Sequence, residues 1–379
     1  MIESEVLDEG AWLPMKPFEY VALPSRVLFG AGYLDRVASE VEALGGRRVF
    51  LIHDPTSEGN AAKVAAALAG KADVKLWGQV VQHVPIDLAE PARRAVDEHS
   101  SDLVVSIGGG SSTGLAKAIA LSHGLPVLAV PTTYAGSEMT TIYGLTGDRH
   151  KQTGKSPQVL PKTVVYDPLL TLGLPANVTG PSAFNSLAHC VEALYAQGHN
   201  PVASAIALEG VRAISESLPR VMRQMGNVEA RGDLLYGAML GGMSLGATAS
   251  GFHHRLCHIL GGKFNLVHAD THSVILPHAV AFNARALPAE MRRLAEALGV
   301  PGGDPAAALW DLATTSGIPT NLASLGCHAR GWKRWRLRSW PRRSTTRCRW
   351  TRQASWRCSA RPTTGSDPPQ PPTSRRITP

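Results

Sequence analysis

Five histidines lie close together in the segment GFHHRLCHILGGKFNLVHADTH, residues 251–272: His253, His254, His258, His268 and His272. An imidazole ring either exchanges protons near neutral pH or binds a transition metal through an uncharged nitrogen. Residues four apart share one face of a helix, so His254 and His258 are expected side by side. The pattern leaves three alternatives open: a metal site, a proton-transfer site, and a group of histidines buried for packing alone.

Three consecutive glycines mark a second candidate site, suited to phosphate. In SDLVVSIGGGSSTGLAKAIALSHG, residues 101–124, an apolar run predicts a buried strand that passes through Gly108, Gly109 and Gly110 into a helix opened by Ser111 and Ser112. Glycine lets the backbone approach a pyrophosphate closely, and the free N–H groups of a helix N-terminus favour anions. The spacing differs from the G-x-G-x-x-G fingerprint, and a tight strand-to-helix turn alone is the alternative.

A further predicted strand ends in hydroxyl-bearing residues. In GLPVLAVPTTYAGSEMTT, residues 124–141, the candidates for binding cofactor phosphates or ribose are Thr132, Thr133, Tyr134 and Ser137. Such groups meet at the carboxyl edge of a parallel sheet, so the two segments together indicate a nucleotide site. Asp54, at the end of the strand predicted at 47–54, is a candidate for the ribose hydroxyls, with a helix N-cap as the alternative.

Alternating strand and helix signals must position these groups. The early segments RRVFLIHD, NAAKVAAALAG, DVKLWGQV and LAEPARRAVDEHS predict strand, helix, strand and helix, which indicates a parallel, doubly wound sheet. From Pro175 onward helical periodicity dominates. The predicted fold class is therefore α/β: an N-terminal doubly wound parallel-sheet nucleotide-binding domain (residues 1–172) followed by an all-α substrate domain (173–326).

Charge and composition narrow the classes of function. The 379 residues carry a formal net charge of +8, but from Cys327 onward thirteen Arg and one Lys oppose a single acid, so residues 1–326 carry −5. Residues 327–379 also hold five of the eight Trp and show no helix or strand periodicity, which indicates an aberrant, frameshifted and disordered tail. A basic nucleic-acid arm is the alternative for this segment. The N-terminus is acidic and the sequence has no long apolar run, which predicts a protein without a membrane segment. The five cysteines lack CxxC spacing, which agrees with a cytoplasmic location.

Several segments, taken in order, resemble the maleylacetate reductase branch of the iron-containing alcohol dehydrogenase superfamily. They are SIGGGSSTGLAKAIAL, VPTTYAGSEMT, KQTGKSPQVLPKTVVYDP, FNSLAHCVEALYA and GFHHRLCHILGGKFNLVHADTHSVILPH. The resemblance covers residues 15–326 and implies a dehydroquinate synthase-like fold. It further implies NADH or NADPH as cofactor, a homodimer, and a small dicarboxylate as substrate, with no nucleic-acid or membrane partner.

The resemblance also assigns the residues of the pocket. The broader superfamily holds a divalent metal with one Asp and three His; here Asn185 stands at the Asp position, and His189, His254 and His268 match the histidines. His258 matches a histidine near the nicotinamide. A neutral amide is a weak substitute for an anionic ligand, so we expect that no metal is required. Three imidazoles with an open position, as in catalytic zinc sites, remain the alternative.

The implied reaction is the NAD(P)H-dependent reduction of the carbon–carbon double bond of maleylacetate to 3-oxoadipate, in the degradation of aromatic compounds. Hydride addition leaves an enolate, which imidazoles can stabilise and protonate. His254 and His258 are the candidates for these two roles, and His189 and His268 frame the pocket. Lys155 and Lys162, in a predicted polar loop with Lys151, are candidates for the substrate carboxylates, with solvated surface lysines as the alternative.

Three rival functions remain open. One is a metal-dependent alcohol or polyol dehydrogenase of the same superfamily, and another is a lyase of the dehydroquinate synthase type. Asn185 weighs against both, because both need a complete metal site. The third is nucleic-acid binding through the basic tail. Cys190 and Cys257 lie beside the histidines, but no acyl-transfer motif accompanies them, so buried packing is expected.

Overall fold

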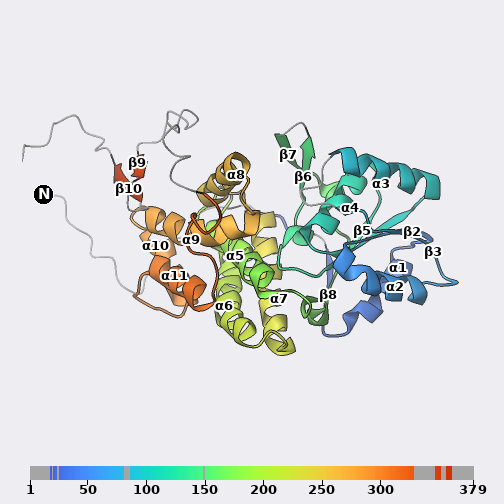
Figure 1. Ribbon diagram of the computed structural model, residues 1–379, viewed down its shortest axis with the longest axis horizontal. Helices are drawn as coiled ribbons and strands as arrows, with labels where there is room; N and C mark the ends of the chain where they lie inside the picture. The colour runs from blue at the N-terminus through green and yellow to red at the C-terminus, as the bar shows by residue number, and fades with distance from the viewer. Residues whose placement is uncertain are drawn as a thin grey trace, which may run out of the picture. The chain divides into compact units, whose positions relative to one another are not determined.

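Six strands form one parallel sheet in the first half of the chain (Figure 1). They are β1 (Arg26–Phe29), β2 (Arg48–His53), β3 (Asp73–Trp77), β4 (Leu103–Gly108), β5 (Val127–Pro131) and β8 (Thr163–Tyr166). Their order across the sheet is β1-β8-β5-β4-β2-β3, and every pairing is parallel. The computed structural model describes residues 18, 20–23, 25–80, 86–147, 150–327, 346–350 and 356–360.

Helices cover both faces of this sheet, because its central strands are apolar on both sides. The four helices are α1 (Val37–Ala43), α2 (Glu58–Ala67), α3 (Ile86–His99) and α4 (Gly110–His123). Leu51 and Val105 pack in one cluster with residues of α1 and α2, whereas their neighbours Phe50 and Val104 pack in another with residues of α3 and α4. Near-continuous apolar strands of this kind are typical of parallel sheets buried between helices.

A hairpin interrupts the alternation between β5 and β8. Strands β6 (Ile142–Gly147) and β7 (His150–Lys155) pair antiparallel, with Ile142 opposite Lys155. The prediction of a polar loop around Lys151 and Lys155 was therefore wrong. The segment HKQTGK has no apolar residue in alternate positions, so its sequence does not predict a strand. The strand is formed instead by backbone hydrogen bonds to β6.

The second half of the described chain is helical, as predicted. It contains α5 (Ala176–Ala193), α6 (Pro201–Arg223), α7 (Val228–Ala247), α8 (Phe252–Phe264), α9 (His268–Asn283), α10 (Pro288–Ala297) and α11 (Pro305–Thr315). Helix α5 is buried along its whole length from Thr179 onward and packs in the core of this part (Figure 1). The predicted fold class is confirmed, while the boundary between residues 172 and 173 stays a prediction.

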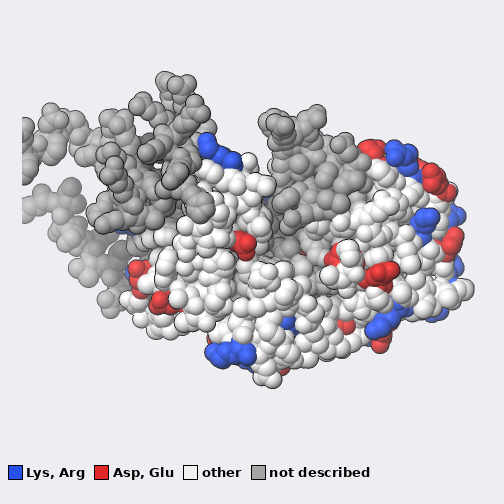
Figure 2. Space-filling model, in the orientation of Figure 1, with Lys and Arg blue, Asp and Glu red and all other residues white. Residues whose placement is uncertain are grey.

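Residues 1–327 and 328–379 form two separate compact units. In the second unit, β9 (Thr346–Trp350) and β10 (Trp356–Ala360) pair antiparallel, and the rest of the predicted disordered tail lies outside the described residues. Acidic and basic side chains are interspersed over the described surface that Figure 2 shows. Among the helices of the described residues, none has the length and apolar character needed to cross a membrane.

Candidate functional site

The glycine turn between β4 and α4 has a shape that only glycine allows. Gly108 has φ +151°, and a Cβ there would lie 2.3 Å from Ser112 Oγ and 2.4 Å from Asp54 Oδ2. The Gly109 N–H donates to Asp54 Oδ2 at 3.1 Å. Helix α4 begins at Gly110 with no side-chain cap, so its first N–H groups face the turn without a capping oxygen. This is the geometry of an anion cradle at a helix N-terminus.

Most of the predicted cofactor residues surround this turn. The Thr132 N–H donates to the Gly108 carbonyl at 3.0 Å, and a Cβ at Gly109 would lie 3.0 Å from Thr133 Cγ2. Ser111 and Ser112 form the first turn of α4, and the buried Ser112 hydroxyl has no hydrogen-bond partner among the described residues. The structure therefore brings the predicted glycines, serines and threonines together at the carboxyl edge of the sheet.

Asp54 contacts the same turn. Its Oδ1 accepts from Thr56 Oγ1 at 2.7 Å, and its Oδ2 accepts from the Gly109 N–H. Asp54 occupies the N-cap position of a short 3-10 helix (Pro55–Ser57) but makes no side-chain cap hydrogen bond. The N-cap alternative therefore fails for the side chain, and Asp54 instead joins the end of β2 to the glycine turn.

Tyr134 does not line the glycine turn. Its side chain is fully buried in the helical core, and its hydroxyl accepts from Arg231 Nη1 at 3.1 Å. Its backbone N–H donates to Ser182 Oγ on α5 at 3.2 Å. The assignment of Tyr134 to the cofactor is thus corrected: an aromatic ring after a sheet strand suits a helix interface as well as a cofactor, and here packing decides.

Lys117 was missed by the sequence analysis. It is buried in α4, and its Nζ donates to the carbonyls of Ser137 (2.6 Å), Thr140 (2.8 Å) and Ile142 (2.8 Å). Burial lowers the pKa of Lys117 to about 7, while the nearby Glu138 acts in the opposite direction. The hydrogen bond from Lys117 to the Ser137 carbonyl therefore fixes the predicted cofactor residue Ser137 against α4. A single Lys in the apolar run GLAKAIAL was the signal available.

The predicted histidines converge from three helices. His189 lies on α5, His254 and His258 on α8, and His268 on α9. The rings of His189 and His254 stack with centroids 4.9 Å apart, and those of His258 and His268 stack at 5.4 Å. His258 is exposed, whereas His189 and His254 are buried. Burial and then the neighbouring histidines His254, His268 and His253 lower the pKa of His189 well below its ordinary value, which favours a neutral ring there.

Glu192 is the main residue of this site that the sequence analysis missed. Its Oε2 lies 2.5 Å from His254 Nδ1 and accepts from the Gly251 N–H at 2.9 Å, and its Oε1 accepts from the His253 N–H at 2.6 Å. Burial raises the pKa of Glu192, but the hydrogen bond and charge of His254 outweigh that effect, so the pKa is lowered overall. An acidic residue three positions after His189 in an otherwise uncharged helix was the signal.

Glu192 determines which atom of His254 is available. The carboxylate engages Nδ1 of His254, so Nε2 is the ring nitrogen that stays available. Nε2 is buried and has no hydrogen-bond partner among the described residues. A carboxylate that orients one nitrogen so that the other can exchange a proton or bind a metal is a common arrangement. Asn185 Oδ1 and His189 Nδ1 are also buried without a partner.

The donor set at the metal position of the superfamily is uncharged. Asn185 donates from Nδ2 to the Ala135 carbonyl at 3.5 Å, which leaves its neutral Oδ1 as the potential ligand. His268 Nε2 lies 3.1 Å from His272 Nε2, so this nitrogen already has a ring partner. The Glu192 carboxylate contacts Nδ1 of His254 and is not part of this donor set. With no anionic atom among its ligands, this set is a poor fit for a tightly held divalent ion.

The two candidate lysines lie at different places. Lys155, the last residue of β7, donates from Nζ to the Thr248 carbonyl at 3.3 Å, close to the start of the histidine helix α8. Lys162 precedes β8, where its N–H donates to the Val127 carbonyl. That is the amino edge of the sheet, opposite the glycine turn, so the structure does not bring Lys162 to the histidines. The side chain of Lys151 lies outside the described residues.

The two cysteines near the histidines are both buried. Cys190 lies in the helical core, and burial raises the pKa of its thiol to about 12. Cys257 Sγ lies 3.6 Å from His253 Nε2. A thiol held in its neutral form is a poor nucleophile, which agrees with the expected packing role.

Comparison with known proteins identifies the class. Residues 24–168 match the family model "Iron-containing alcohol dehydrogenase", and residues 179–337 match "Fe-containing alcohol dehydrogenase family, C-terminal". The chain belongs to the iron-containing alcohol dehydrogenase family and is an oxidoreductase.

Several relatives of this chain within that family are named maleylacetate reductase. The chain is 48% identical to a maleylacetate reductase of Burkholderia cepacia, over 84% of this chain and 89% of the relative, and 49% identical to that of Sphingobium indicum, over 82% and 87%. It is also similar to the crystal structure of maleylacetate reductase from Agrobacterium tumefaciens, with TM-score 0.80 and 43% identity, over 84% and 89%. The resemblance inferred from the motifs is confirmed.

Proposed function

We propose that the chain catalyses the NAD(P)H-dependent reduction of the carbon–carbon double bond of maleylacetate, giving 3-oxoadipate. The relatives' name supplies the substrate, and one observation carries the chemistry: His254 is held by Glu192 at Nδ1 and presents an unpartnered, buried Nε2. A conjugated ketone takes a hydride at the alkene and a proton at the neighbouring carbon. The protein must therefore bind the substrate, stabilise an enolate and deliver one proton.

For the cofactor, we assign its pyrophosphate to the turn at Gly108, Gly109 and Gly110 and to the N-terminus of α4. When bound, the nicotinamide supplies the hydride. The Gly109 N–H, oriented by Asp54, and the hydroxyls of Ser111, Ser112, Thr132 and Thr133 surround this cradle. The geometry is equally suited to the shared pyrophosphate of NADH and NADPH.

For the proton, we assign His254 as the donor. With Nδ1–H donated to the Glu192 carboxylate, a proton on Nε2 can pass to the substrate and leave His254 neutral. The exposed His258, with its ring centroid 6.4 Å from that of His254, is placed to return a proton from solvent. His189 and His268 frame the pocket, and Asn185 faces it with an amide oxygen. Lys155 is the remaining candidate for a substrate carboxylate.

We propose that the reaction needs no metal. Asn185 offers a neutral amide oxygen at the position where the family has an anionic ligand, which weakens the binding of a divalent ion. The substrate also does not require a Lewis acid, because hydrogen bonds from imidazole are adequate to stabilise the enolate that forms when hydride adds to the alkene conjugated with the ketone. We further propose a cytoplasmic homodimer.

The direct test follows NADH oxidation optically, with maleylacetate and with simple alcohols and ketones as substrates. We expect turnover with maleylacetate, and a fall of at least roughly 10²-fold in kcat for His254→Ala with little change in NADH binding. His199→Ala is the matched control, because His199 lies outside the cluster and hydrogen-bonds the Ala196 carbonyl. Turnover restricted to alcohols would instead assign the chain to the polyol dehydrogenases.

A further inference from the structure

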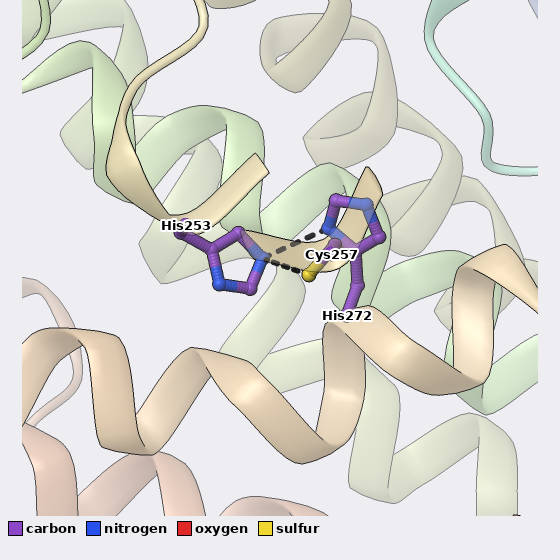
Figure 3. Close-up of side chains that lie close together, drawn as sticks. All are labelled: His253, Cys257 and His272. Carbon is purple, nitrogen blue, oxygen red and sulfur yellow. Dashed lines mark hydrogen bonds between the residues drawn. The ribbon is translucent and has the colours of Figure 1, made fainter. Parts of the chain in front are cut away.

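Behind the proposed proton donor, three side chains with metal-ligating atoms converge (Figure 3). His253 and Cys257 lie four residues apart on α8, so they share one helix face, and His272 points toward them from α9. His253 Nε2 lies 2.9 Å from His272 Nδ1 and 3.6 Å from Cys257 Sγ. The three ligand atoms lie within 4.8 Å of one another, and all three residues are fully buried.

We propose that this group, the His₂Cys trio, binds a thiophilic d¹⁰ cation of the Cu⁺ or Zn²⁺ class. Thiolate sulfur with imidazole nitrogen is the ligand combination that such ions prefer. Ligand atoms about 2.0–2.3 Å from one ion lie roughly 3–4 Å from each other. Two separations within the trio, 2.9 and 3.6 Å, are close to this range and the third is within 4.8 Å, so an ion requires only side-chain adjustments.

The protonation states of the trio suit a cation. Burial, followed by the neighbouring His254, lowers the pKa of His253 to about 3, and burial lowers that of His272 well below its ordinary value. Both rings are therefore neutral, and the one proton in the hydrogen bond between His253 Nε2 and His272 Nδ1 moves to the other nitrogen of its ring when an ion binds. Burial raises the pKa of the Cys257 thiol, so the thiol stays protonated without an ion. On binding, the S–H bond breaks, a sulfur–metal bond forms, and one proton passes to solvent.

Glu192 adds negative charge beside the trio. Its Oε1 accepts from the backbone N–H of His253 at 2.6 Å. A carboxylate at this position stabilises a positive ion in a buried pocket without serving as a ligand. The trio is separate from the metal position of the superfamily, since it includes neither Asn185, His189, His254 nor His268, and it alone contributes sulfur.

Occupation of the trio has a consequence for the reaction, and this part rests on the proposed function. His272 Nε2 lies 3.1 Å from His268 Nε2. An ion on Nδ1 of His272 leaves the proton on its Nε2, which makes His272 the donor and fixes His268 Nε2 as the acceptor. The ring of His268 is then constrained at the edge of the catalytic pocket. We expect reduction of maleylacetate to be inhibited by such ions.

The test measures binding without substrate, so it does not depend on the reductase activity. The full chain is titrated anaerobically with Cu⁺ against a colorimetric Cu⁺ chelator, and X-ray absorption spectroscopy identifies the scattering atoms. We expect one Cu⁺ per chain with one sulfur and two nitrogen neighbours, and at least tenfold weaker binding in Cys257→Ala. Cys190→Ala is the control, because Cys190 is also buried but lies outside the trio.

Equal binding by the wild type and Cys257→Ala, or a bound ion without a sulfur neighbour, would overturn the proposal. Cys257→Ser serves as a second variant if the alanine variant does not fold. A parallel Zn²⁺ titration decides which ion of the class binds more tightly. If the ion binds with sulfur but leaves turnover unchanged, the site stands and the coupling through His272 to His268 fails.

Discussion

At the scale of residues, Asn185 and Glu192 set the charge of the histidine pocket from the same helix. Asn185 leaves the expected metal position without an anionic ligand, while Glu192 places its carboxylate on the far side of His254. The negative charge of this helix therefore lies beside His254, the proposed proton donor, and not at the metal position of the family. The sequence predicted His189, His254, His258, His268 and Asn185 by their types and order. It did not predict Glu192, because a hydrogen bond across 62 residues has no local pattern.

Replacing the carboxylate by an amide isolates the effect of its charge. We expect Glu192→Gln to reduce kcat for maleylacetate by roughly 10²-fold with little change in KM, since general acid catalysis contributes about that much. The amide offsets the positive charge of a protonated His254 less than the carboxylate does, so the alkaline limb of the pH–rate profile, where the proton donor is lost, should move to lower pH. Far-UV circular dichroism checks that α8 persists. An unchanged profile would show that Glu192 serves only to cap α8.

At the scale of elements, the N-terminus of α4 and the end of β4 form the turn that we propose as the cofactor cradle. The sequence located both, because the apolar run of β4 and the glycines lie in adjacent positions. The side-chain direction of Tyr134 was not predictable, since it depends on Arg231 and α5, which lie far along the chain. The position of Lys162 was mispredicted for a similar reason. Its place in the sequence does not show that it lies at the amino edge of the sheet, away from the histidines.

The glycine turn offers a matched pair of substitutions. In Gly108→Ala the new Cβ meets Ser112 Oγ and Asp54 Oδ2 at a φ of +151°, so we expect the KM for NADH to rise at least tenfold. In Gly59→Ala, inside α2, a Cβ meets nothing within 4 Å, and we expect unchanged kinetics with a stability gain of about 0.5–1 kcal/mol. Initial rates over a range of NADH concentrations give both KM values. Equal KM values for the two variants would contradict the assignment of the pyrophosphate to this turn.

Packing of α5, α8 and α9 around neutral histidines makes the protein sensitive to acid. The native pKa values of His189, His253 and His272 lie below the ordinary 6.5, so below about pH 6.5 the unfolded chain binds more protons than the folded one. The free energy of unfolding should therefore fall as pH decreases, by up to roughly 1.4 kcal/mol per pH unit for each histidine. Urea unfolding at pH 7.5 and 5.5 measures this.

A variant identifies the source of the acid sensitivity. His253→Asn removes one titrating ring, so the dependence of unfolding free energy on pH should become shallower than in the wild type. His199→Asn, which leaves the cluster intact, should retain the full dependence. Wild-type stability that is equal at both pH values would contradict neutral histidines in the core.

At the scale of the whole molecule, the folded unit and the family match end at similar positions. The first compact unit ends at Cys327, and the C-terminal family match ends at residue 337. The order of the main strands and helices up to this point was predictable because both periodicities are strong, but the β6–β7 hairpin was not. Composition alone marked the change at Cys327. The sequence could not assign the pairing of β9 with β10, since residues 346–360 show no apolar alternation.

We predict that the Arg-rich and Trp-rich segment contributes nothing to catalysis. Deleting residues 328–379 should leave kcat/KM for maleylacetate within about twofold of the full chain, because the segment lies in a separate compact unit. Steady-state kinetics of both proteins tests this. If the truncated protein folds but loses activity, the segment contributes to catalysis and the prediction is wrong. DNA binding by the full chain with steep salt dependence, lost on truncation, would support the nucleic-acid alternative.

We propose above all that the chain reduces maleylacetate without a metal, with His254, oriented by Glu192 beside the neutral Asn185, as the proton donor. The most direct measurement compares kcat for maleylacetate before and after exhaustive chelation, with metal content determined on the same samples, for the wild type and Asn185→Asp. The wild type should keep its full rate at substoichiometric metal. The variant regains an anionic ligand and should bind Zn²⁺ more tightly. Loss of wild-type turnover on chelation, restored by one equivalent of a divalent ion, would contradict the account.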